Sequence, residues 1–453
     1  MAGAADLRYA PEPGASLKVL RWKRFVQGDE DVWTANTRKF TEQTGIAVQV
    51  ESVNGEDLRP KGAMAANVGA GPDILIGPSD MPQLYPDQCV DLTELADYLG
   101  KKYGGWYDAC RHYCMLERRW ISIPIAVIAY CVVYRESMVK AAGYSAIPRD
   151  LPGFLKLCQA LKARGAPAGF ALGNSSGDTT WCSWLVWAHG GRLADENNRV
   201  VINSPETVAA LEYARELYPT FVQGTLSWLD PSNNKAFLAG DISLTYNPIS
   251  IYYVAKNSDD PALKAIAEDT RHAPMPIGPV GHATELNSML TAFAFKYSKY
   301  PDAAREYLRF MLERAQYEAW QQASLGYMTQ PLRAYESNPV WTGDPKITLF
   351  RDGGRVMLYN GYAGTVGAAS AACSADLVIA NMVAEAASGQ STPREAAARA
   401  EQRAALLQNL SRLRAGTLRG GGLCTSNRKG GASPAPCTPR RSALPLYSEN
   451  IAH

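Results

Sequence analysis

The most suggestive chemical pattern in the sequence is Gly173-Asn-Ser175-Ser-Gly177, which matches the Gly-x-Ser-x-Gly pattern of a serine nucleophile elbow. In such an elbow the serine lies on a tight turn from which a helix starts almost at once, and a histidine takes its proton. Here Asp178 and Thr179 still separate the pattern from the helix, and the downstream histidines, His272 and His282, lie in a Pro- and Gly-rich loop. No His-Gly-Gly oxyanion segment precedes the serine. A serine hydrolase using Ser175 is therefore an alternative interpretation of the stretch, and not the preferred one.

Signatures of metal and cofactor chemistry are weak. Cys110 and Cys114 are the only close pair among nine cysteines, and they lack the second half of a zinc site. We therefore expect buried thiols or one local disulfide, and no metal. Gly69-Ala-Gly71 lacks a third glycine and precedes a predicted strand, so it is no dinucleotide loop. The sequence contains neither a Walker lysine motif nor His-Glu-x-x-His, and we expect no cofactor.

Aromatic and amide side chains are the remaining candidates for a functional site. An aromatic ring can stack on the apolar face of a sugar while Asn and Asp bind its hydroxyl groups. Each aromatic side chain taken alone could equally belong to the core. The candidates that fall in predicted loops or at element ends are Trp22, Tyr130, Trp181, Tyr246 with Asn247, Asn287 and Tyr362.

Three tryptophans, Trp181, Trp184 and Trp187, lie on one predicted helix that follows the polar loop. Residues three apart are offset by about 60° around a helix, so the three rings cannot all face one ligand. Trp181, on the first turn, is predicted to contact the ligand. Trp187 is predicted to be core, and the pattern leaves Trp184 undecided.

The elements that would position these residues indicate an α/β fold. The chain has 453 residues with 46% hydrophobic and 20% charged, which is typical of a globular protein of two or three domains. Strands at 17–22, 46–53 and 74–76 alternate with helices, which predicts a mostly parallel sheet with ligands at the carboxyl ends of its strands. The extended run 121–134 is long enough to leave one sheet and enter another. A strand at 288–295 is predicted to return to the first sheet, followed by one helix over 301–322.

A series of motifs from Leu17 to Leu410 resembles the extracellular solute-binding proteins of ABC importers, in the carbohydrate-binding family that includes maltose-binding protein. Each motif is weak alone, but their order is specific. The motifs are Gly71-Pro72-Asp73-Ile, the crossing around Pro124, Gly173 to Gly191, Asn203-Ser-Pro-Glu206, Asn234-Lys-Ala-Phe-Leu-Ala-Gly240, Pro276-Ile-Gly-Pro279 and Ser391-Thr-Pro-Arg-Glu395.

The resemblance implies two α/β lobes of a periplasmic binding protein, joined by three interdomain crossings, with a ligand cleft between them. It implies a small-molecule ligand, a sugar or polyol, that is delivered to the permease subunits of an importer, and no catalysis. Lys23 and Arg24 leave open an anionic ligand such as a sugar acid or organophosphate. The ligand contacts that the resemblance implies come from Trp22 to Arg24, Ser79, Asp80, Trp181 with Trp184 as a further candidate, Tyr246, Asn247 and Tyr362.

The expected organisation is an N-terminal arm at 1–16, lobe 1 at 17–123 plus 286–330, lobe 2 at 124–285 plus 331–411, and a disordered, non-native tail at 412–453. Most of the basic excess lies after Gln402, so the body is mildly acidic and gives no sign of a nucleic-acid partner. We expect no signal peptide within this sequence, and Met1-Ala-Gly-Ala-Ala resembles an initiator Met before a signal-peptidase site. We expect a periplasmic monomer.

Overall fold

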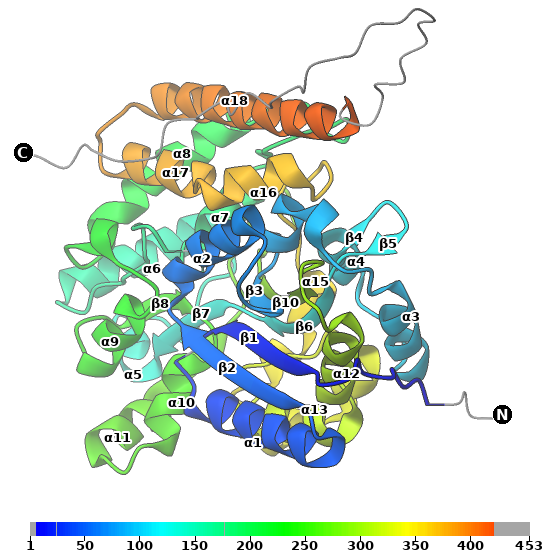
Figure 1. The fold of residues 1–453 in the computed structure, drawn as a ribbon. Helices are drawn as coiled ribbons and strands as arrows, with labels where there is room; N and C mark the ends of the chain where they lie inside the picture. Colours follow the sequence, from blue (N-terminus) through cyan, green and yellow to red (C-terminus); the bar gives the residue numbers. More distant parts are fainter. Residues whose placement is uncertain (1–5, 24, 176, 421–453) are drawn as a thin grey trace, which may run out of the picture. The chain divides into compact units, whose positions relative to one another are not determined.

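A five-stranded mixed sheet with strand order β2-β1-β3-β10-β6 organises the first part of the chain (Figure 1). The computed structural model describes residues 6–23, 25–175 and 177–420. Strand β1 pairs in parallel with β2 and β3, whereas β10 pairs antiparallel with β3 and β6. The predicted return of the strand near residue 288 to the first sheet is therefore confirmed. The strands are β1 Ser16–Trp22, β2 Ala47–Val53, β3 Ile74–Pro78, β6 Ile123–Ile128 and β10 Ser288–Ala294.

Helices α1, α12 and α13 pack together beside this sheet (Figure 1). The single helix predicted over 301–322 is two helices, because the backbone of Glu313 is extended. The Glu313 carboxylate accepts hydrogen bonds from Lys102 and Arg309 at this break, and hydrophobic periodicity contains no sign of it. The helices from α1 to α4, with α12 and α13, are α1 Gln27–Thr44, α2 Gly55–Val68, α3 Thr93–Lys102, α4 Asp108–Cys114, α12 Pro301–Met311 and α13 Arg314–Ala323.

A second, three-stranded antiparallel sheet has the order β8-β7-β9. The chain reaches it directly from β6 through Ala129 and Tyr130, so the extended run does leave one sheet and enter the other. The predicted lobe boundary at residue 124 falls inside β6, and the boundaries of the lobes stay a prediction. The strands of this sheet are β7 Cys131–Arg135, β8 Leu244–Asn247 and β9 Thr270–Ala273, and the hairpin β4 Met115–Leu116 with β5 Arg119–Trp120 stands apart.

Helix α7 contacts both α8 and α17, and α8 packs along α17. Helix α8 begins at Pro205, where the Ser204 side chain accepts from the N–H of Thr207 and caps the helix. The stretch from Asp195 to Ile202 predicts a turn followed by a strand, but the structure has a single bridge there, between Ala194 and Val200. The helices of this region are α5 Glu136–Ala141, α6 Leu151–Ala163, α7 Trp181–Ala188, α8 Pro205–Leu217, α9 Ser232–Ala239, α10 Ser250–Asn257 and α11 Pro261–Asp269.

The last described helices follow a loop-rich segment that contains α14 Val340–Gly343 and α15 Gly353–Val356. Residues 368–387 are apolar enough to cross a membrane by length and composition alone, as core helices of globular proteins also are. They form two helices, α16 Ala368–Ala375 and α17 Val378–Ala387. Thr392 and Glu395, from the motif Ser391-Thr-Pro-Arg-Glu395, form a capping box at the start of α18 Pro393–Gly420. Helix α18 continues to Gly420, past the predicted start of the tail at residue 412, and that boundary stays a prediction; residues 421–453 lie outside the described part.

Candidate functional site

Two cavities are lined by residues at strand ends and by residues of neighbouring helices. The first, called here the hydroxyl-lined cavity, has about 770 Å³ of space between atoms, part of which is open to solvent. Its polar lining is Ser79, Thr179, Thr180, Ser183, Ser288, Ser374, Asn287, Asn360, Asp80 and Arg59, and its apolar lining includes Trp187, Leu193, Leu286, Leu377, Val378 and Ile379. The second, called here the charged cavity, has about 1190 Å³.

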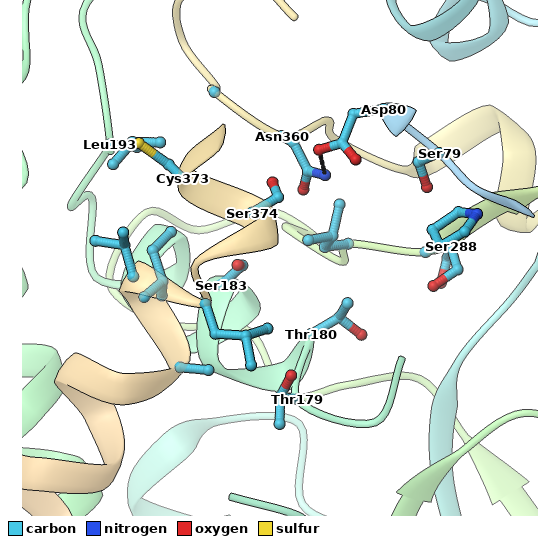
Figure 2. A pocket seen from close by; sticks show the side chains of 18 of the residues that line it. Ser79, Asp80, Thr179, Thr180, Ser183, Leu193, Ser288, Asn360, Cys373 and Ser374 are labelled. Atoms are coloured by element: carbon cyan, nitrogen blue, oxygen red, sulfur yellow. Dashed lines mark hydrogen bonds between the residues drawn. The ribbon is translucent and has the colours of Figure 1, made fainter. Parts of the chain in front are cut away.

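The end of β3 supplies the acidic group of the hydroxyl-lined cavity. Strand β3 is buried throughout, and Ser79 and Asp80 follow its carboxyl end, where ligands of parallel sheets bind. Asp80 is fully buried, and it accepts hydrogen bonds from Arg59 Nη2 at 2.8 Å and from Asn360 Nδ2 at 2.7 Å. Figure 2 shows the Asn360 and Asp80 side chains turned toward each other across this bond. The Asp80 carboxylate at the cavity wall is therefore already paired within the protein.

One face of the α7 region forms another wall of the same cavity. Thr180, Ser183 and Trp187 line it, and their spacing of three and four residues puts them on one side of a helix. Figure 2 shows Thr180 and Ser183 at this wall. Trp187 meets the ring of Tyr362 edge-on, with 5.8 Å between ring centroids and an interplanar angle of 69°. The Tyr362 contact fixes the tryptophan at the wall, although Tyr362 itself does not line the cavity.

A stacked tyrosine pair has one ring at the charged cavity and the other hydrogen-bonded to Thr180, which lines the hydroxyl-lined cavity. The rings of Tyr130 and Tyr246 are 4.8 Å apart and nearly parallel, at 8°. Tyr130 lines the charged cavity, whereas the Tyr246 hydroxyl shares a 2.9 Å hydrogen bond with Thr180 and donates to the Leu286 carbonyl at 3.0 Å. Burial raises the pKa of Tyr246 well above its ordinary value, so this hydroxyl stays neutral.

Asn287 connects this pair to the hydroxyl-lined cavity. Its Oδ1 accepts from the Tyr130 N–H at 2.9 Å, and its Nδ2 donates to the Gly353 carbonyl at 2.9 Å. Both ends of the amide are therefore used to hold the crossing between the sheets. Asn287 lines the cavity, but its amide serves chiefly to position the backbone at Tyr130 and Gly353.

The charged cavity contains groups of both signs. Lys23 and Lys235 lie in its wall together with Glu56, Asp178 and Asp230. Cations and carboxylates are thus mixed, which does not favour an anionic ligand. Asn247 also lines this cavity, but its amide is already bonded to Asn233, Ser250 and the Pro248 carbonyl. Arg24, the other cation predicted for an anionic ligand, lies outside the described residues.

Three of the predicted tryptophans line neither cavity. Trp22 packs on Gly55, where a Cβ atom would come within 2.6 Å of the indole ring. Trp181 and Trp184 are each only 1% exposed, and their indole N–H groups donate to the carbonyls of Ala171 at 2.7 Å and Pro276 at 3.1 Å. This arrangement does not support the prediction that the ligand contacts Trp22, Trp181 and Trp184. Those contacts stay a prediction.

Ser175, the candidate nucleophile, lies in a buried turn. Its Oγ atom has no hydrogen-bond partner among the described residues, and the helix begins only at Trp181. The histidines that sequence analysis named are bonded elsewhere, His272 to the Lys346 carbonyl and His282 to the Val280 carbonyl. The described residues contain no nucleophile–base pair at this serine.

The cysteines are buried thiols in the described part of the chain. Seven of them are free, including Cys110 and Cys114, so the alternative of a local disulfide there is not realised. Cys424 and Cys437 lie outside the described residues. No group of three potential metal ligands occurs among the residues that the structure describes.

Comparison with known proteins decides the family. Residues 36–349 match the family described as bacterial extracellular solute-binding protein. The chain belongs to this family. The resemblance inferred from the ordered motifs is thereby confirmed, and membership of an extracellular family indicates an exported protein.

Solved structures support the same fold for this solute-binding protein. Maltose-bound MalE3 of T. maritima is 20% identical, with a TM-score of 0.72 over 87% of this chain and 100% of that one. A solute-binding protein of Agrobacterium radiobacter K84 in complex with ribitol is 16% identical, with a TM-score of 0.71 over 87% and 99%. The predicted two-lobed α/β binding-protein fold is confirmed by this similarity.

A curated relative adds a weaker sequence match. A probable ABC transporter-binding protein of Deinococcus radiodurans is 23% identical over 200 residues, which are 42% of this chain and 47% of the relative. The match thus spans about half the length of that protein.

Several cavity residues of the solute-binding protein were missed by sequence reasoning. Arg59 lies in the middle of a helix and carries no motif, so no signal pointed to it. Asn360 is two residues from the predicted Tyr362, and the same aromatic and amide pattern could have found it. Trp187 was assigned to the core because it lies a turn and a half beyond the polar loop, but it shares with Thr180 and Ser183 the helix face that lines the cavity.

Proposed function

We propose that this solute-binding protein is the receptor of an ABC importer and captures a neutral sugar or polyol in the hydroxyl-lined cavity. The observation that carries the proposal is the lining of that cavity. Among the described residues, six Ser and Thr and two Asn line this cavity together with apolar side chains, and the charged side chains of that lining, Arg59 and Asp80, form an ion pair. Such a lining suits a ligand with many hydroxyl groups and apolar C–H faces.

The structurally similar proteins point in the same direction. They include proteins described with maltose and ribitol, which are a neutral sugar and a neutral polyol. The chain would act in the periplasm as a monomer, close its lobes around the ligand and deliver it to permease subunits in the membrane. It would catalyse no reaction, and the absence of a base at Ser175 among the described residues supports that role.

A thermal-shift screen of the purified chain over sugars, polyols and sugar acids tests this function. A ligand at 100 times its Kd stabilises the folded state by about 2.7 kcal/mol. We expect that a neutral sugar or polyol gives the largest increase in melting temperature. Stabilisation by sugar acids alone would replace the proposal with a receptor for anions, and ester hydrolysis lost in Ser175→Ala would replace it with an enzyme.

A further inference from the structure

Two hydrogen-bond donors at the hydroxyl-lined cavity have no acceptor. Trp187 is 3% exposed, and its buried Nε1 atom has no hydrogen-bond partner among the described residues. The buried Nη1 atom of Arg59 likewise has none in that part of the chain. Both side chains line the same cavity. Because buried donors in folded proteins are nearly always paired, each of these two requires a specific explanation.

The other tryptophans of α7 show that the lack of a partner is particular to Trp187. Trp181 and Trp184 are buried to a similar degree in the same helix, and each donates its indole N–H to a backbone carbonyl. Their hydrogen bonds are complete within the protein. The indole of Trp187 is the one on this helix that remains able to bind an acceptor supplied by an occupant of the cavity.

Arg59 has an N–H donor without a described acceptor, although its positive charge is already paired. Its Nη2 atom is bonded to the fully buried Asp80, which also accepts from Asn360. The guanidinium charge is therefore neutralised by the carboxylate, and Nη1 is a directed donor and not an unpaired cation. A neutral oxygen, such as a hydroxyl or ring oxygen, is the acceptor that suits such a pair.

We propose that Trp187 Nε1 and Arg59 Nη1 donate hydrogen bonds to two oxygen atoms of a neutral polyhydroxylated ligand in the hydroxyl-lined cavity. This inference rests on the proposed function and makes Trp187 the specificity-determining tryptophan of α7, in place of Trp181. The ring of Trp187 also provides an apolar surface for the C–H groups of the ligand. Removal of either donor should weaken ligand binding while the protein still folds.

The test is calorimetric titration of wild type, Trp187→Phe and Trp184→Phe with the neutral sugar or polyol that stabilises the wild type most. Trp187→Phe keeps an aromatic ring and removes one donor, so we expect Kd to rise about 3- to 10-fold. The smaller ring leaves space in the buried wall, so the melting temperature of the free protein should fall somewhat in this variant and in any matched Trp→Phe control. Trp184→Phe is the matched control. It removes a satisfied hydrogen bond, so it should lower the melting temperature and leave Kd within about twofold.

Arg59→Lys provides a second test that does not depend on the folding of Trp187→Phe. Lysine keeps the positive charge beside Asp80 but cannot present the second guanidinium donor, so Kd should again rise about 3- to 10-fold. A wild type that binds the ligand while both Trp187→Phe and Arg59→Lys bind equally well would overturn this inference alone. Equal weakening by Trp187→Phe and Trp184→Phe would also overturn it. A wild type that binds no neutral sugar or polyol would overturn the proposed function as well.

Discussion

Replacing Asp80 by Asn tests whether the buried pair at the end of β3 stabilises the site. Asp80→Asn keeps the shape of the side chain but removes the charge that pairs with Arg59. Asp80 accepts two hydrogen bonds, and a hydrogen bond to a charged group contributes about 1.5 to 3 kcal/mol. The amide oxygen can still accept one of them, and the Arg59 side chain is 17% exposed, so water compensates part of the loss.

We therefore expect Asp80→Asn to lower the free energy of unfolding by about 2 kcal/mol, which for a chain of this length corresponds to a decrease in melting temperature of about 2 °C. Denaturant unfolding followed by circular dichroism measures the change. Glu51→Gln is the control, because the Glu51–Lys61 pair is exposed on both sides and should contribute less than about 0.5 kcal/mol.

The double variant Arg59→Met, Asp80→Asn makes the measurement decisive. If the loss in Asp80→Asn comes from an unpaired guanidinium group, removing that group should restore part of the stability. A value for Asp80→Asn within 0.5 kcal/mol of the wild type would refute this reasoning. So would a double variant that loses more free energy of unfolding than the two single variants lose together.

Two further predictions concern buried groups outside the cavity. Burial lowers the pKa of His272 from 6.5 to about 4, so the unfolded chain binds the proton more readily than the folded chain. The stability that is present above about pH 6.5 is therefore lost as the pH falls toward 4. The expected loss in the free energy of unfolding between pH 7 and pH 5 is about 2 kcal/mol. Comparison of thermal unfolding against pH for the wild type and His272→Gln should show that loss only in the wild type, and parallel profiles would contradict it. Ser175→Ala removes a buried hydroxyl whose Oγ has no described partner, so the variant should be as stable as the wild type or up to about 2 kcal/mol more stable. Destabilisation by more than about 1 kcal/mol would mean that the hydroxyl is bonded after all.

The sequence predicts much of the fold because local signals mark many of its elements. Gly45 ends α1 in a left-handed conformation, Ser204 caps α8, and Thr392 with Glu395 starts α18. The break at Glu313 is missed because it depends on contacts with Lys102 and Arg309, which side-chain periodicity does not encode.

The candidate site is predicted less completely because it is assembled from distant segments. Ser79 and Asp80 were found because ligands bind at the carboxyl ends of parallel strands, a rule that needs only the order of elements. Arg59 and Trp187 could not be found in this way. Whether they reach the cavity depends on which face of α2 and of α7 is turned toward it, and that is decided by packing between elements far apart in the chain.

The most direct test of the receptor role is calorimetric titration of the full chain with the neutral sugar or polyol that stabilises it most, alongside the corresponding sugar acid. The proposed function predicts saturable binding of one neutral ligand per chain and much weaker binding of the acid. Preferential binding of the acid, or no saturable heat with any neutral sugar or polyol, would contradict it.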